Sequence, residues 1–263
     1  MSAPQLPAVA VNMAMTLDGK VMRPDGGWHG LTSNADRERM DRYRREADLL
    51  IVGKNSISKD DPPVVPAGSG RAPVACMIAR NSLPPADRKI FTAPAPRRPL
   101  LLLGNRQPAV LRAIGNQNTR SGRALDPAAL TPPDPTDTSS HAAPDAAEQF
   151  ALLKSLAERA RVILFPPELL EPAPVLDYLY REHAVRRVLL EGGPQVNHAF
   201  FAADLVDVLH LTLVPYLIGQ RDLPGIVDGA EPFGRLDHPD SGWQLDRCEP
   251  HGREVFLTYS RVR

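Results

Sequence analysis

The chain has 263 residues, enough for a sizeable hydrophobic core in one large domain or two small ones. Its 31 lysines and arginines balance 31 aspartates and glutamates, so no net positive field argues for nucleic acid or an anionic membrane as a partner. The two cysteines form no CxxC pair, the seven histidines lack metal-ligand spacing and no apolar run could span a bilayer, so we expect a cytoplasmic protein without a dedicated metal site.

The first predicted elements alternate between strands and a helix. Residues 8–15 form an apolar run that ends in the turn sequence TLDGK, which predicts a strand. Residues 32–47 are dense in charge and begin with three residues that can cap a helix (Thr32, Ser33 and Asn34), which predicts a mostly solvated helix. Further strands are predicted at residues 48–53, 72–78 and 98–105.

Residues 115–147 are rich in Pro, Ser, Thr and Asp and poor in large apolar residues. We interpret this segment as a peripheral surface insertion in a single domain, residues 1–263, because it has no complete domain on either side. After it, predicted helices at 148–160, 172–184 and 194–203 alternate with strands at 161–165 and 185–193, and strands at 207–219 and 254–262 follow. The alternation predicts an α/β fold with a twisted, mostly parallel sheet flanked by helices, and antiparallel pairing at one edge.

The sequence Glu191-Gly192-Gly193-Pro194 joins a predicted strand to a predicted helix. Glycines allow the backbone to approach a ligand closely, and the free N–H groups of the first helical turn favour an anion such as phosphate. Two glycines also make an ordinary strand-to-helix turn for steric reasons alone. The carboxylate of Glu191 favours a ligand-binding role for the turn, because α/β sheets bind ligands at the carboxyl ends of their strands.

Two further strand ends carry polar residues, in VGKNSISKDDP (residues 52–62) and MAMTLDGKV (residues 13–21). Taken together in this order, the segments NMAMTLDGKV, RYRREADLLIVGKNSISKDDP and VLLEGGPQVNHAFFAADLVDVLHLTLVPYLIG resemble the reductase family of bacterial and archaeal riboflavin biosynthesis. That family is the C-terminal domain of a bifunctional deaminase–reductase and has a dihydrofolate-reductase-like fold. The zinc motifs HxE and PCxxC of the deaminase are absent, so the chain resembles a stand-alone reductase.

The resemblance implies NADPH as the cofactor. Arg80 is a candidate partner for the cofactor's 2′-phosphate, although it could equally be a solvated loop charge. The other positions that match cofactor contacts of the family are Ala14, Ser56, Asp60, Gly192, Gly193, Pro194, Gln195, Val196 and Asn197.

On the substrate side, the resemblance implies contacts from Arg44, Val64 and Glu191, and we add Trp28 as a candidate. Glu191 would accept hydrogen bonds from ring N–H groups, and Asp60 and Glu191 are the candidate catalytic residues for proton transfer. The chain departs from the family pattern at Trp28, where a serine is common, at Gly30, where a tryptophan is common, at Ala67, where an arginine is common, and at Ala79 and Arg80, which replace Asp and Ser.

The resemblance therefore implies an NADPH-dependent reductase that converts the ribosyl group of 5-amino-6-(5-phosphoribosylamino)uracil into a ribityl group. Two alternatives stay open: reduction of another pterin-like or pyrimidine-like compound, and a non-catalytic nucleotide-binding paralogue. The resemblance also implies a homodimer, in which the strand at 207–219 could lie at the interface or, equally, in the core of one subunit.

Overall fold

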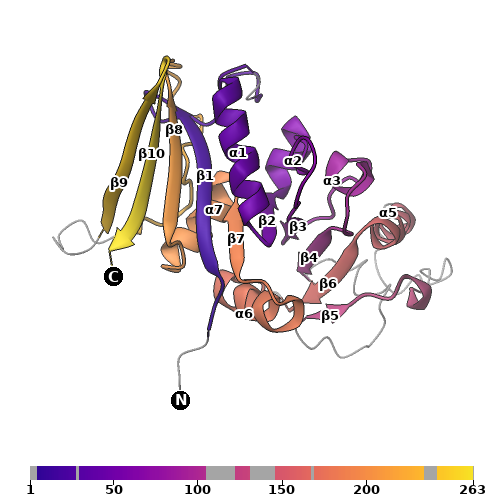
Figure 1. The fold of residues 1–263 in the computed structure, drawn as a ribbon. Coiled ribbons are helices and arrows are strands. Elements are labelled where there is room, and N and C mark those ends of the chain that lie inside the picture. Colours follow the sequence, from indigo (N-terminus) through magenta and orange to yellow (C-terminus); the bar gives the residue numbers. More distant parts are fainter. Residues whose placement is uncertain are drawn as a thin grey trace.

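The computed structural model describes residues 5–27, 30–104, 122–130, 146–166, 169–233 and 242–262. In this part of the chain one twisted sheet runs through the molecule, with helices on both faces (Figure 1). The strands are β1 Ala8–Thr16, β2 Leu49–Gly53, β3 Val74–Ala79, β4 Leu100–Gly104, β5 Arg123–Ala124, β6 Arg161–Phe165, β7 Arg187–Leu190, β8 Val208–Val214, β9 Gly242–His251 and β10 Glu254–Val262. The helices are α1 Asn34–Glu46, α2 Lys54–Asp60, α3 Lys89–Thr92, the short 3-10 turn η1 Pro127–Ala129, α5 Ala146–Arg159, α6 Pro172–His183 and α7 Pro194–Ala202.

The strand order across the sheet is β5-β6-β4-β3-β2-β7-β1-β8-β10-β9. The seven strands from β6 to β8 in this order are parallel to one another. The pairs β5–β6, β8–β10 and β10–β9 are antiparallel. The predicted α/β class, the mostly parallel sheet and the antiparallel edge at the C-terminal strands are confirmed. Because the strands are parallel, their carboxyl ends lie along the same edge of the sheet.

The hydrophobic core lies on both faces of the sheet, because successive side chains of a strand point to opposite faces. In β2, Leu50 and Val52 pack with α2, α3 and α5, while Leu49 and Ile51 pack with α6 and α7. All four side chains are at most 3% exposed. A strand buried on both faces has a continuous apolar sequence, which is why LLIVG could be recognised without alternation.

Helix α1 is held over the C-terminal strands by polar side chains. Ser33 caps the helix, and the Glu254 carboxylate accepts hydrogen bonds from the Ser33 N–H (2.7 Å) and hydroxyl (2.6 Å). Further along, the ring of Tyr43 stacks on His210 of β8 with 3.9 Å between centroids. The helix is therefore not mostly solvated, as its charge had suggested: Arg39 and Arg44 are 6% and 3% exposed.

The turn after β1 is tied to the segment after β8. Asp18 accepts hydrogen bonds from the Thr16 hydroxyl (2.6 Å) and from the backbone N–H of Gly219 (2.7 Å), and these bonds lower the pKa of its carboxyl to about 2. Lys20 donates to the carbonyl of Leu223 at 2.9 Å. The polar residues of TLDGK thus hold the turn after β1 against the segment after β8.

Residues 122–130 belong to the segment interpreted as an insertion, and two of them, Arg123 and Ala124, form a strand of the sheet. Strand β5 pairs with β6, and Leu125 and Leu130 pack against the core. The interpretation of a surface insertion in a single domain stays a prediction, and β5 is the outermost strand of the sheet. The greater part of the segment, residues 115–121 and 131–145, lies outside the described residues.

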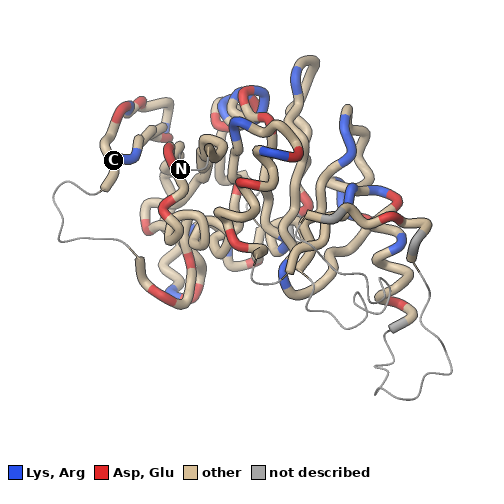
Figure 2. The backbone as a smooth tube through the Cα atoms, turned by 90° about the horizontal axis from the view of Figure 1, so that it is seen from below, with Lys and Arg blue, Asp and Glu red and all other residues tan. Residues whose placement is uncertain are grey.

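Strand β8 lies inside the sheet, between β1 and β10, so its backbone is already paired on both sides. The strand at this edge of the sheet is β9, whose side chains are mostly exposed. Figure 2 shows acidic and basic residues interspersed along the described chain. Among the described helices, none is both long and apolar enough to cross a membrane.

Candidate active site

The carboxyl ends of β2, β3 and β7 surround a cavity of about 290 Å³. Residues at the ends of these strands line part of the cavity, and the N-terminal parts of α2, α6 and α7 line most of the rest. The cavity is lined by Gly53, Lys54, Asn55, Ile78, Arg80, Asn81, Leu170, Glu171, Pro172, Gly193, Pro194, Gln195, Val196, Ala199 and Phe200.

Glycines at the ends of β2 and β7 allow two backbone segments to touch. The Gly53 N–H donates to the carbonyl of Gly192 at 2.6 Å, and a Cβ added to Gly53 would lie 2.5 Å from the backbone nitrogen of Gly193. A Cβ added to Gly193 would lie 3.1 Å from the Ser56 hydroxyl oxygen. Gly192 has a φ of +83°, a conformation that favours glycine. The glycines thus have a steric role, because they let the two strand ends touch. Gly53 and Gly193 also leave backbone on one wall of the cavity, which we call the cradle.

The N-terminus of α7 faces this cradle, because Gly193 to Val196 line the cavity. Gly193 is the N-cap and forms no side-chain cap, and Pro194 occupies the first turn. The first-turn N–H groups and the positive end of the helix dipole favour an anion at this position.

The other end of the cavity carries an ion pair. Arg80, just after β3, donates to the Glu171 carboxylate at 2.6 Å and to the Leu170 carbonyl at 2.9 Å. Both side chains are partly exposed, at 40% and 49%. Lys54 also lines the cavity, and its ammonium donates to the Ser82 hydroxyl.

A buried ion pair lies directly before the glycine turn. Arg44 of α1 donates through Nε to one Glu191 oxygen (2.7 Å) and through Nη2 to the other (2.5 Å). The side chains are 3% and 10% exposed. Burial alone would lower the pKa of the Arg44 guanidinium, but the charge and hydrogen bonds of Glu191, with Asp41 nearby, raise it above its ordinary value.

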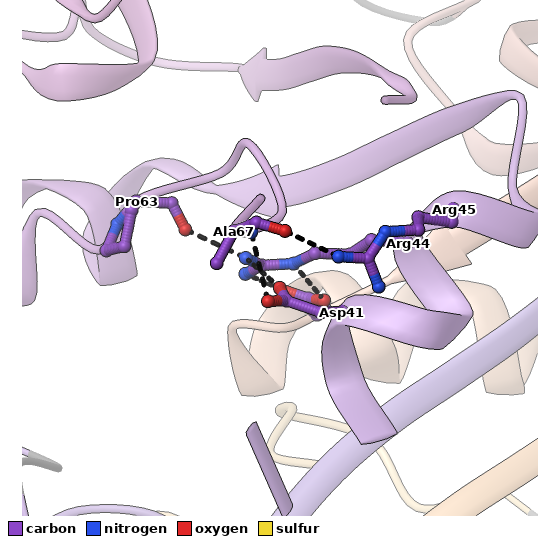
Figure 3. A network of polar contacts seen from close by, with 6 residues as sticks. Asp41, Arg44, Arg45, Pro63 and Ala67 are labelled. Atoms are coloured by element: carbon purple, nitrogen blue, oxygen red, sulfur yellow. Dashed lines mark hydrogen bonds and ion pairs between the residues drawn. The ribbon is translucent and has the colours of Figure 1, made fainter. Parts of the chain in front are cut away.

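The C-terminal part of α1 also holds the loop that follows α2 (Figure 3). Arg44 donates through Nη1 to the Pro63 carbonyl at 3.0 Å, and Asp41 accepts a hydrogen bond from the Ala67 N–H at 3.0 Å. Arg45 donates to the Ala67 carbonyl at 2.5 Å. One helix therefore fixes both the Glu191 carboxylate and this loop, which contains Val64.

The structure brings together most of the cofactor positions predicted from the sequence. Arg80, Gly193, Pro194, Gln195 and Val196 line one cavity, and Ser56 and Gly192 lie beside it. Asn197 does not line it: its side chain is fully buried and donates to the Ile226 carbonyl at 2.8 Å. Ala14 lies on β1 and is likewise outside the cavity lining.

The predicted substrate positions Arg44 and Glu191 also come together, as partners of each other. The carboxylate of Glu191 is paired with Arg44 of α1 and not with an arginine of its own strand. Val64 is 4% exposed. Asp60 is the last residue of α2, with a side chain that is not described, and Trp28 lies outside the described residues.

Sequence reasoning missed Lys54, Asn81, Leu170 and Glu171 as lining residues. Lys54 and Asn81 follow strand ends, a position that signals a site in parallel sheets. Glu171 gave no such signal, since the prediction placed it just ahead of a helix that begins with proline. Among the described residues, no cluster of three or more His, Cys, Asp or Glu side chains could hold a metal ion.

Comparison with known proteins decides the family. The model of the RibD C-terminal domain matches residues 7–256. The chain belongs to this family. The reductase resemblance read from three motifs is thereby confirmed over nearly the whole chain.

Two curated relatives of similar length are named 2,5-diamino-6-ribosylamino-4(3H)-pyrimidinone 5′-phosphate reductase. The chain is 28% identical to the one from Archaeoglobus fulgidus over 223 residues, which cover 85% of this chain and 87% of the relative. It is 26% identical to the one from Methanothermobacter thermautotrophicus over 227 residues, which cover 85% and 84%.

Among solved structures, the deaminase and 5-amino-6-(5-phosphoribosylamino)uracil reductase of Thermotoga maritima is similar in fold. The TM-score is 0.66 at 18% identity, and the match covers 97% of this RibD-family chain but 57% of the longer protein. The chain thus spans little more than half of that bifunctional protein. The predicted dihydrofolate-reductase-like fold agrees with this neighbour.

Proposed function

We propose that this protein is an NADPH-dependent reductase of riboflavin biosynthesis that acts on a phosphorylated ribosylaminopyrimidine. The observation that supports it best is the cradle, in which Gly53 and the first turn of α7 line one cavity, with Glu191 of the buried Arg44–Glu191 pair directly after β7, the strand that leads into α7. The membership of the chain in the RibD C-terminal domain family adds to this observation.

The residues present fit a dinucleotide cofactor. Gly53 and Gly193 present backbone to the cavity, and the first turn of α7 offers free N–H groups that would bind phosphates there. Ser56 would offer its hydroxyl beside Gly193, and Ala14 and Asp60 complete the proposed cofactor contacts. Asn197 would contribute indirectly, by fixing the segment at Ile226.

When bound, the reduced nicotinamide supplies a hydride. Conversion of the ribosyl group into a ribityl chain would require C1′ to gain this hydride, the bond from C1′ to the ring oxygen to break, and that oxygen to gain a proton. The protein's residues position the sugar carbon, exclude water and deliver the proton. The candidates for proton delivery are Asp60, Glu191 and an ordered water. Both Glu191 oxygens accept hydrogen bonds from Arg44, an arrangement that suits an ionised acceptor facing ring N–H groups.

Two substrates fit this proposal, and they differ at carbon 2 of the pyrimidine ring. The uracil expected from the resemblance has an oxygen there, and the diaminopyrimidinone of the two named relatives has an amino group. With the N3 edge of the ring turned toward Glu191, the carboxylate would accept from N3–H in either compound, and it could accept a second hydrogen bond at that edge only from the 2-amino group. Glu191 therefore favours the diaminopyrimidinone 5′-phosphate.

The test is NADPH oxidation by the purified protein with each pyrimidine in turn, followed by the fall in nicotinamide absorbance. We expect turnover with both and a higher kcat/KM for the diaminopyrimidinone. Binding of NADPH without turnover of either compound would favour the non-catalytic paralogue. Turnover of the uracil alone would overturn the argument from Glu191. A homodimer stays a prediction that rests on the family resemblance.

A further inference from the structure

The ion pair at the far end of the cavity is not used by the reaction described above. Glu171 is the N-cap residue of α6, but its side chain forms no cap, and its carboxylate accepts instead from Arg80 Nη1 at 2.6 Å. Arg80 is held a second time by the Leu170 carbonyl, at 2.9 Å from Nη2. The pair thus places one negative and one positive charge side by side on the cavity wall.

The sheet order indicates which part of a dinucleotide would meet this pair. Along the carboxyl edge the strands run β7-β2-β3-β4-β6, and neighbouring strands are spaced by about 4.8 Å. Arg80 follows β3 and Glu171 follows β6, so they lie on the order of 10–20 Å from the end of β7 and Glu191. A cofactor with its reactive ring near Glu191 and its phosphates at α7 would extend its adenosine toward the part of the lining that contains Ile78, Arg80 and Glu171.

We propose that Glu171 is a specificity residue that limits the preference of this site for a 2′-phosphorylated nicotinamide cofactor. The inference rests on the proposed function, because it requires the cofactor to occupy this cavity. A carboxylate accepts a hydrogen bond from a free ribose 2′-hydroxyl and repels a phosphate, whereas a guanidinium binds phosphate through paired donors. The two residues of one ion pair therefore favour opposite cofactors.

The balance of charge follows from the contacts. Arg80, Lys54 and Glu171 are the charged side chains among the described residues that line the cavity, so their formal sum is one positive charge. A phosphate monoester carries about two negative charges near neutral pH. It must share Arg80 with Glu171 or displace the carboxylate from it. Neutralising Glu171 releases the guanidinium and doubles the positive charge that faces the phosphate.

The experiment measures binding of NADPH, NADH, adenosine 2′,5′-bisphosphate and 5′-AMP to the full chain by calorimetry. The variants are Glu171→Gln, which keeps the size of the side chain, and Arg80→Gln. The matched control is Asp177→Asn on the same helix, where the carboxylate pairs with Arg181 and does not line the cavity. The control removes the same charge from α6, so it reports any long-range electrostatic effect.

We expect Glu171→Gln to bind NADPH and the bisphosphate roughly three- to tenfold more tightly, because the pair is partly exposed and salt-screened. NADH and 5′-AMP should bind equally well or up to about threefold more weakly in that variant. Arg80→Gln should reverse the NADPH preference, and Asp177→Asn should change no ratio. The gain in Glu171→Gln should shrink as salt is raised.

A ratio of NADPH to NADH affinity that stays within twofold of wild type in Glu171→Gln would overturn the inference, as would an equal shift in Asp177→Asn. Those outcomes leave the proposed function intact, since the cofactors still bind. Absence of binding by folded wild-type protein to either cofactor would instead refute the proposed function and the inference with it. Far-UV circular dichroism of each variant confirms that it is folded.

Discussion

The buried pair of Arg44 and Glu191 allows a quantitative test of how the site is held together. Glu191→Gln keeps the shape of the side chain but replaces one acceptor oxygen with an NH2 group that faces guanidinium N–H groups. Arg44 is 3% exposed, so its charge then loses the carboxylate of Glu191 in a nearly dry position and keeps that of Asp41, which lies 3.7 Å from Nη1. Arg44→Met removes the cation while keeping much of the apolar stem, and the double variant removes both partners.

The magnitude follows from the geometry of the pair. Removing one partner of a buried ion pair costs about 3–5 kcal/mol. Because glutamine retains one acceptor, we expect about 2–3 kcal/mol of lost stability for Glu191→Gln. For a chain of this size that lowers the Tm by roughly 4–10 °C. The double variant should lose less than the sum of the single variants, with a coupling energy of about 2–3 kcal/mol.

Thermal and urea unfolding of wild type, the two single variants and the double variant complete a double-mutant cycle. NADPH binding and turnover are measured well below the lowest Tm of the four proteins. We expect NADPH affinity within about twofold of wild type, because the cavity is lined from Gly193 onward and not by Glu191. The kcat/KM of Glu191→Gln should fall by at least about tenfold, since a donor then faces the ring N–H groups. Additive stability losses would refute the pair, and unchanged turnover in a folded Glu191→Gln protein would refute its contact with substrate.

Three further outcomes are expected. Gly53→Ala should weaken NADPH binding by at least about tenfold in calorimetry, because its Cβ would lie 2.5 Å from the Gly193 nitrogen and would displace the cradle. An affinity equal to wild type would show that binding does not need the close contact between Gly53 and Gly193. Burial and the charges of Arg39 and Arg42 lower the pKa of His210 to about 4 from 6.5, so the free energy of unfolding should fall by at most about 3 kcal/mol as the pH drops from 6.5 to 4. The decline should be shallower in His210→Gln, and parallel urea-midpoint curves would contradict this account. Deleting residues 131–145 should leave Tm and NADPH affinity nearly unchanged, whereas deleting residues 122–130 should lower the Tm because β5 and Leu125 are lost from the sheet and core. Equal effects of the two deletions would argue against a peripheral position for residues 131–145.

Most elements of the fold could be predicted because each has a local signal. Strand β6 and strand β10 begin and end at the predicted residues, and α6 and α7 each end one residue before the predicted boundary. An apolar run, an alternating run or a proline at the first turn determines these elements without help from distant residues.

The missed elements lack such a signal. Helix α2 has the sequence KNSISKD, and among its described side chains, those of residues 54–58, Ile57 is the fully buried one, so no helical period is visible. Strand β9 carries mostly exposed polar side chains and is held by its backbone pairing with β10. Pairing with a neighbouring strand is a tertiary contact, and it can override a poor local pattern.

The residues of the site also differ in whether a local sequence signal marks them. Positions next to a strand end could be predicted as a group, because parallel strands bring their carboxyl ends to one edge, and this accounts for Arg80, Glu191 and the turn after it. The partner of Glu191 could not be predicted: Arg44 is separated from it by 147 positions and was one of several arginines on a helix that looked solvated. Its burial depends on how α1 crosses the sheet, which Ser33, Asp36 and Tyr43 fix through contacts with β8 and β10. The chemistry of Glu191 thus depends on the C-terminal strands, which hold the helix that supplies its cation.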